Sequence, residues 1–355
     1  MRSFYIFIFT LFTGSYFIGK SRYFRNPSKA MMIYAWIVIV FFCGGIDALQ
    51  QGGDIMNYYN HVLRANQLSF PAYATTSSFE RGYLLVVWLL STYLPHPQIY
   101  MYLQYGFTTA LFLYFIYKNT SDCFSGLVFF VCIGGFTFYM TAFRQGIAAA
   151  ICLLAILQFQ KRRTIRALLL MLIATQFHQT AIVFLPFILV YKIPLSKKSF
   201  LWFTILAIAA VSSLEKIVGF ANERFGMGYN NGVGGSVGAL INFVIFLFFL
   251  YELYKTTYNH NSMFVESIEK RSLSVVVYMA LASISLYGMR FAVLALERVA
   301  FYFIPAVCPL WGYVMYERMD AYGRQKNSDL IALILIVLLC VRFSHTFGGM
   351  DLIYW

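Results

Sequence analysis

The stretch KSRYFRNPSKAMMIYAWIVIVFFCGGID, residues 20–47, decides the class of this protein. Its first part is basic, whereas residues 30–46 carry no charged side chain and end at Asp47. A helix that crosses the hydrocarbon core of a bilayer needs about 20 apolar residues. Loops rich in Lys and Arg favour the cytoplasmic side of a membrane. The stretch therefore predicts an inner loop followed by a transmembrane helix that leads outward.

The rest of the chain has the same apolar character. Of its 355 residues, 60% are hydrophobic and only 12% are charged, with a formal net charge of +13. Soluble domains carry about 25% charged residues. This composition excludes a soluble enzyme, a nucleic-acid-binding domain and a disordered protein, so we expect no nucleic acid as a partner. The cysteines form no CxxC pair and lie mostly in apolar runs, which predicts buried hydrophobic side chains.

The apolar runs predict an all-α fold, a polytopic transmembrane bundle with about 10–12 membrane segments in a single integral membrane domain, residues 1–355. Spans are expected at 3–19, 30–46, 99–117, 123–140, 143–160, 199–215, 237–254, 272–290, 298–316 and 329–346. Two further apolar stretches do not fit a simple crossing. The stretch 82–95 is too short for a transmembrane helix. The stretch 165–191 is longer than one crossing needs and is interrupted around His178.

The charged loops predict an orientation, and this orientation tests whether each of the two stretches crosses the membrane. Basic residues place 161–166 and 192–198 inside, and acidic residues place the 47–80 loop outside. A chain that changes sides needs an odd number of crossings, yet four apolar segments separate 47–80 from 161–166. We therefore expect 82–95 to be re-entrant or peripheral. We also expect 165–191 to form a re-entrant hairpin with His178 at its tip, the alternative being one long tilted helix.

Ionisable groups within or beside spans are costly and are functional candidates. In the predicted orientation they gather on the outer side, where the Gly-rich loop 216–236 also falls. Each candidate has a structural alternative. Arg144 could extend to the headgroups, His178 could make an interhelical hydrogen bond, and Glu297 could pair with one neighbouring arginine and leave the other over. Asp54 could begin an ordinary interfacial helix.

The sequence contains no pattern typical of a metal site. No two histidines lie three or four residues apart, and neither H-E-x-x-H nor G-x-S-x-G occurs, so we expect neither a metal nor a cofactor. Arginine binds phosphate in a bidentate manner and keeps its charge at any pH. Three outward arginines therefore favour a lipid-linked pyrophosphate over a small neutral solute as the ligand.

Four short motifs follow one another along the chain. They are DIMNYY at 54–59, FRQGIA at 143–148, ATQFHQTA at 174–181 and RVAFYF at 298–303. As an ordered set they resemble the EpsG family of bacterial polysaccharide polymerases, which is related to the Wzy-type O-antigen polymerases. The resemblance covers nearly the whole chain. One position departs from it, because family members often carry an arginine where residues 42–47 read FCGGID.

The resemblance implies a multi-pass protein of the bacterial inner membrane with an active site at the outer face. The implied reaction transfers a growing glycan from undecaprenyl pyrophosphate to the non-reducing end of another lipid-linked repeat unit. The implied partners are the undecaprenyl-pyrophosphate-linked oligosaccharide, membrane lipid and a chain-length regulator protein. Two other functions stay open, a transporter or flippase of the lipid-linked oligosaccharide and an O-antigen ligase-like glycosyltransferase.

For this reaction the expected residues fall into two groups. The expected catalytic residues are His178, Arg144, Glu297 and Asp54. The expected substrate-binding residues are Arg290, Arg298, Tyr58, Tyr59, Glu80 and Tyr302. Arg144 is the first choice for the pyrophosphate. His178 is the preferred general base because a histidine side chain titrates near neutral pH, with the three carboxylates as alternatives.

Overall fold

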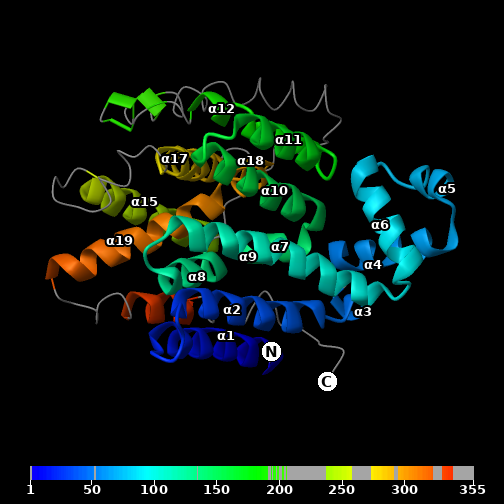
Figure 1. Ribbon diagram of the computed structural model, residues 1–355, viewed down its shortest axis with the longest axis horizontal. Helices are drawn as coiled ribbons and strands as arrows, with labels where there is room; N and C mark the ends of the chain where they lie inside the picture. Colours follow the sequence, from blue (N-terminus) through cyan, green and yellow to red (C-terminus); the bar gives the residue numbers. More distant parts are fainter. Residues whose placement is uncertain are drawn as a thin grey trace.

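A computed structural model describes residues 2–51, 53–133, 135–190, 237–257, 273–291, 295–322 and 330–338, with isolated positions between 193 and 205. Helices make up most of these residues, and no β-strand occurs among them. The all-α polytopic membrane fold is therefore confirmed (Figure 1). The predicted span 199–215 lies largely outside the described residues, and the Gly-rich loop 216–236 lies wholly outside them.

Four helices in the described ranges are long and apolar enough to cross a membrane. They are α2 (Pro27–Gly44), α7 (Pro97–Asn119), α10 (Phe143–Gln160) and the greater part of α15 (Val237–Thr257). Local sequence explains where two of them begin, since Pro27 and Pro97 occupy first-turn positions that need no hydrogen-bonded N–H. The Asn26 side chain accepts the Lys29 N–H at 2.9 Å and completes the start of α2.

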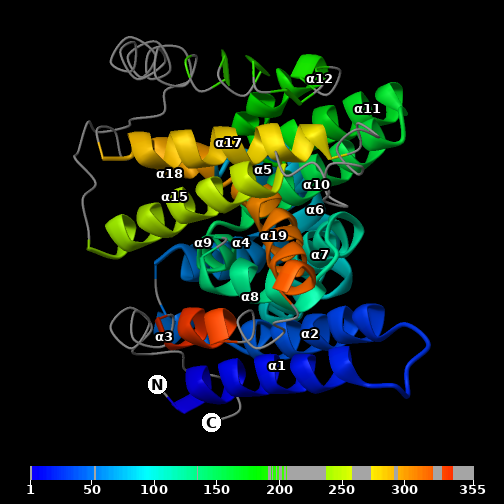
Figure 2. The ribbon, with the colours of Figure 1, turned by 90° about the vertical axis from the view of Figure 1, so that its left-hand side faces the viewer.

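The helices pack as a layered bundle around an aromatic core. α1 (Arg2–Lys20) and α2 lie side by side at one edge, and α17 (Ser274–Met289) lies near α15 on the other side of α7 and α10 (Figures 1 and 2). The largest fully buried side chains are tyrosines and phenylalanines, among them Tyr83, Tyr105, Tyr287 and Tyr302. A tyrosine buried at this depth needs a partner for its hydroxyl group. The interior is therefore apolar with polar links inside it.

Two of the predicted spans are not continuous helices. Residues 123–140 form α8 (Cys123–Cys132) and α9 (Phe136–Thr141), because Gly135 between them adopts the left-handed φ of +82°. Residues 298–316 divide among α18 (Ala295–Ala300), the 3-10 turn η2 (Ile304–Ala306) and α19 (Val307–Tyr322). Pro305 lacks the N–H that an uninterrupted α-helix would use there. The prediction of single helices was wrong at both places.

The segment 47–80, which is predicted to connect two spans on the outer side, is mostly helical. It contains α3 (Ala48–Gln51), α4 (Gly53–Gln67) and α5 (Phe70–Ala74). With α6 (Arg81–Tyr93) these helices gather at one end of the bundle (Figure 1). α6 has 13 residues, about 20 Å of helix, and packs on α4 and α5. It is too short to cross a bilayer, as the parity argument predicts.

The 165–191 stretch is interrupted where its polar residues occur. α11 (Thr164–Thr175) packs along α10 and ends just before Gln176, and the 3-10 helix η1 (Gln179–Phe184) begins after His178. A further turn of helix, α12 (Phe187–Val190), packs against α17. The alternative of one long helix is therefore wrong. The side of the membrane that each basic loop faces stays a prediction.

Candidate active site

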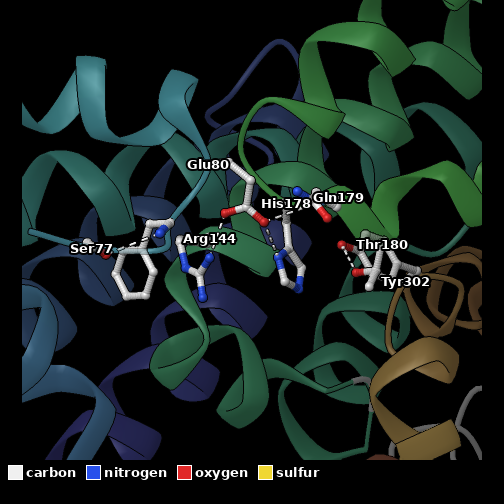
Figure 3. Close-up of polar contacts among 8 residues, drawn as sticks. Ser77, Glu80, Arg144, His178, Gln179, Thr180 and Tyr302 are labelled. Carbon is white, nitrogen blue, oxygen red and sulfur yellow. Dashed lines mark hydrogen bonds and ion pairs between the residues drawn. The ribbon is translucent and has the colours of Figure 1, made fainter. Parts of the chain in front are cut away.

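Three distant chain segments meet at one carboxylate. Glu80 lies just before α6, Arg144 lies in the first turn of α10, and His178 lies just before η1 (Figure 3). Glu80 Oε2 accepts a hydrogen bond from Arg144 Nη1 at 2.5 Å. Glu80 Oε1 lies 3.0 Å from His178 Nδ1 and accepts the Gln179 backbone N–H at 3.1 Å. We call Glu80, Arg144 and His178 the Glu80 cluster.

A glycine lets the start of α6 approach the turn that carries His178. The backbone N–H of Tyr83 donates to the Gln176 carbonyl at 3.0 Å. A Cβ atom on Gly82 would lie only 2.6 Å from the Gln176 Cβ atom and 2.8 Å from its carbonyl oxygen. Only glycine permits this approach. Glu80 makes no side-chain cap to its own helix, so its carboxylate is available to Arg144 and His178.

Aromatic rings hold Arg144 in place. Its guanidinium lies over the Phe79 ring at 3.7 Å from the centroid, a favourable cation–π distance. Ser77 Oγ accepts the Phe79 N–H at 3.1 Å and fixes that turn (Figure 3). The Tyr58 ring stacks on Phe143, with centroids 4.7 Å apart and planes 9° from parallel. Arg144 keeps 21% of its side chain exposed, which leaves it accessible to a ligand.

The electrostatics of the Glu80 cluster favour an ionised carboxylate. Burial alone would raise the pKa of Glu80, but the hydrogen bond from His178 and the charge of Arg144 outweigh it and lower the pKa to about 2. His178 Nδ1 must then be the donor in its bond to Glu80, which leaves Nε2 as the basic nitrogen. Among the described residues nothing bonds to Nε2, and 23% of the His178 side chain is exposed. Of the candidate bases, this geometry favours His178 over Glu80.

A second ion pair lies later in the chain. Arg290, at the end of α17, is 8% exposed, pairs with Glu297 in α18 and donates to the Tyr287 hydroxyl at 3.1 Å. The Arg298 side chain is exposed and has no ion-pair partner in the described part of the chain. Glu297 therefore pairs with Arg290, as in the structural alternative considered for it. Arg298 is left without an ion-pair partner among the described residues.

Two hydrogen bonds connect α18 and the turn after it to residues beside the Glu80 cluster. Gln145 Nε2 donates to the Arg298 carbonyl at 2.6 Å, directly beside Arg144. The hydroxyl group of Thr180, which lies two residues after His178, is 2.8 Å from that of Tyr302 (Figure 3). Both contacts attach α18 and its following turn to the starts of α10 and η1. The backbone of Arg298 is therefore held at the same end of the bundle as Arg144.

The other predicted site residues differ in their placement. Asp54 is exposed at the start of α4 and makes no hydrogen bond or ion pair with the Glu80 cluster. Tyr58, one turn later, is buried, and burial raises the pKa of its hydroxyl although the neighbouring Arg144 opposes the rise. Tyr59 is half-buried against the core. Tyr302 is fully buried, so no face of its ring is open to a sugar.

Sequence reasoning missed several residues that build this site. Phe79 and Gly82 flank Glu80 and Arg81 but match no known motif. Thr180 stands within one of the four short motifs, two residues after His178, and that closeness was the available signal. His61 is buried with its ring 4.5 Å from that of Phe79. Burial, with the charges of Arg64 and Arg144, lowers the pKa of His61 to about 4, so it is neutral at physiological pH.

The sequence profile of the EpsG family matches residues 31–352, nearly the whole chain and all of the Glu80 cluster. This chain belongs to the EpsG family. EpsG proteins are Wzy-like polysaccharide polymerases, so the resemblance seen in the four motifs is confirmed and the family suggests a membrane polysaccharide polymerase in general. Comparison with curated proteins and with solved structures found no significant match.

Proposed function

We propose that this EpsG-family protein polymerises a polysaccharide at the outer face of the bacterial inner membrane. It transfers a growing glycan from undecaprenyl pyrophosphate to the non-reducing end of another lipid-linked repeat unit. The observation that carries the proposal is the Glu80 cluster, in which one largely enclosed carboxylate, 10% exposed, contacts both a histidine and an arginine. A general base and a phosphate-binding cation side by side are what transfer from a sugar pyrophosphate needs.

The proposed reaction forms one bond and breaks one. The oxygen of the acceptor hydroxyl attacks the anomeric carbon of the donor glycan, and the bond from that carbon to the pyrophosphate oxygen breaks. The hydroxyl proton passes to His178 Nε2, the nitrogen that faces away from Glu80. The lipid pyrophosphate leaves as an anion. A positioned base contributes about 10²- to 10⁴-fold to the rate of such a step.

The three arginines differ in charge balance, which suggests a division of their roles. Glu80 balances Arg144 and Glu297 balances the buried Arg290, whereas Arg298 has no carboxylate partner in the described ranges. In the proposal Arg298 attracts the anionic pyrophosphate. Arg144 then stabilises the charge that develops on the departing oxygen, where a fixed cation contributes most. Arg290 holds α18 in position.

A deletion strain analysed for glycan length tests the proposal. The expected result is a single repeat unit on the lipid carrier or on its final acceptor, and long chains should return when the wild-type gene is restored. Loss of all surface glycan, with intact lipid-linked precursor left inside, would mean a flippase instead. Full-length polymer that remains on the carrier would mean a ligase. Either of these two results overturns the proposed function.

A further inference from the structure

Three N–H donors converge on the Glu80 carboxylate. Oε1 faces His178 Nδ1 at 3.0 Å and the Gln179 backbone N–H at 3.1 Å, and Oε2 faces Arg144 Nη1 at 2.5 Å. An ionised carboxylate is a pure acceptor with about four lone-pair sites, so it can satisfy all three donors together. No other side chain of similar size and shape can do so. The arrangement therefore selects for a carboxylate and not merely for a polar residue.

The same arrangement determines where the hydrogen on the His178 ring lies. The hydrogen bond made by one ring nitrogen determines which nitrogen carries the proton. With Nδ1 bonded to Glu80, the hydrogen stays on Nδ1 and Nε2 keeps its lone pair. Without that partner nothing would hold the hydrogen on Nδ1. A histidine with its hydrogen on Nε2 has no lone pair there to accept a proton.

We propose that Glu80 is the positioning residue of the polymerase, which holds His178 as the Nδ1–H tautomer and makes that tautomer depend on Arg144. The inference rests on the proposed function, in which His178 Nε2 takes the acceptor proton. It goes further because it assigns Glu80 neither to the substrate nor to proton transfer. The one carboxylate connects the proton-accepting side of the reaction to the pyrophosphate side, through atoms that never touch the sugar.

A simpler interpretation gives Glu80 only a structural role, as an ion pair that holds α6 against α10. Replacement by glutamine separates the two interpretations, since an amide offers one oxygen to three donors. If that oxygen faces Arg144, the amide NH₂ group faces His178 Nδ1 and Gln179, and the ring is driven to the Nε2–H tautomer. If the amide turns over, its NH₂ group faces the Arg144 guanidinium. The first orientation opposes the His178 and Gln179 donors and blocks the base, and the second opposes the Arg144 donor alone. Arg144 keeps its charge at any pH and binds the amide oxygen more strongly than the two neutral donors do, so the first orientation is the favoured one.

Nitrogen-15 NMR of histidine-labelled protein reads the tautomer without any need for catalysis. The chain contains 5 histidines, and the His178 signals are those that disappear in a His178→Gln variant. Purified full-length wild type, Glu80→Gln and Glu80→Asp are compared. Glu297→Gln is the matched control, because it breaks the other arginine–carboxylate pair at the same end of the bundle.

The wild type should show Nδ1 protonated and Nε2 unprotonated, and Glu297→Gln should keep that pattern. Glu80→Gln should lose it, with a fall of about 100-fold or more in the polymerisation rate. Glu80→Asp should recover part of both, because it restores a carboxylate. A wild-type His178 with its hydrogen on Nε2 overturns the inference, as does a Glu80→Gln variant with the wild-type tautomer and rate. The assignment of the protein as a polymerase would survive either result, since the glycan pattern of the deletion strain decides it separately.

Discussion

Replacing Arg144 with alanine should destabilise the protein as well as stop polymerisation. The change leaves the Glu80 carboxylate, only 10% exposed, without its cationic partner. Glu80 has a pKa of about 2 where the reference value is 4.5, and that difference corresponds to about 3 kcal/mol of favourable interaction in the folded state. His178 and Gln179 supply part of it. We therefore expect Arg144→Ala to cost about 2 kcal/mol at neutral pH, including the stacking lost over Phe79.

A double variant separates the stability effect from the catalytic one. In Glu80→Gln/Arg144→Ala the unpaired charge is gone, so most of the lost stability should return while polymerisation stays absent. Thermal unfolding in detergent of the wild type, both single variants and the double variant gives the comparison, and glycan length in the same strains gives activity. An Arg144→Ala protein as stable as the double variant would refute the reasoning, because it would mean that the unpaired Glu80 carboxylate costs the folded state nothing.

Three further predictions concern the same end of the bundle. Gly82→Ala should destabilise the protein by about 1–3 kcal/mol and abolish activity, because the added Cβ atom would collide with Gln176 in the turn between α11 and η1. Gly106→Ala, whose Cβ meets nothing closer than 3.8 Å, is the control and should unfold like the wild type. Arg298→Ala should raise the apparent KM for the lipid-linked donor about tenfold or more at unchanged stability, whereas Arg290→Ala should lower the unfolding temperature. Because the pKa of Glu80 is lowered, its stabilisation is full above about pH 4.5 and declines as the pH falls toward about 2. Stability curves that lack this decline in wild type, or show it equally in Glu80→Gln, would contradict the assignment.

Apolar length and charge predicted most of the fold. Uninterrupted runs such as 30–46 and 143–160 became single helices, because the bilayer demands a long apolar helix and nothing in these runs prevents one. The prediction of a single helix was wrong for the runs at 123–140 and 298–316, for a local reason in each case. A left-handed glycine at 135 and a proline at 305 interrupt the backbone but leave the segment apolar overall. Hydropathy alone does not register either one.

The sequence indicated residues of the candidate site but not how they pair. Ionisable residues in apolar surroundings marked Arg144, His178 and Glu80, since such groups are rarely placed there without a use. Their partners depend on contacts between segments 64 and 98 residues apart, which only the tertiary structure defines. The close approach at Gly82 is equally invisible in sequence, because one glycine at a helix start resembles many others.

The central claim is that this protein lengthens a lipid-linked glycan with His178 as the base. Its most direct test is a reaction of purified wild-type protein with lipid-linked repeat units isolated from the deletion strain, followed by separation of the products by size. The account predicts a ladder of multiples of the repeat unit, and its loss in a folded His178→Gln variant. Folded wild-type protein that yields only single repeat units, or an undiminished ladder from the His178 variant, would contradict it.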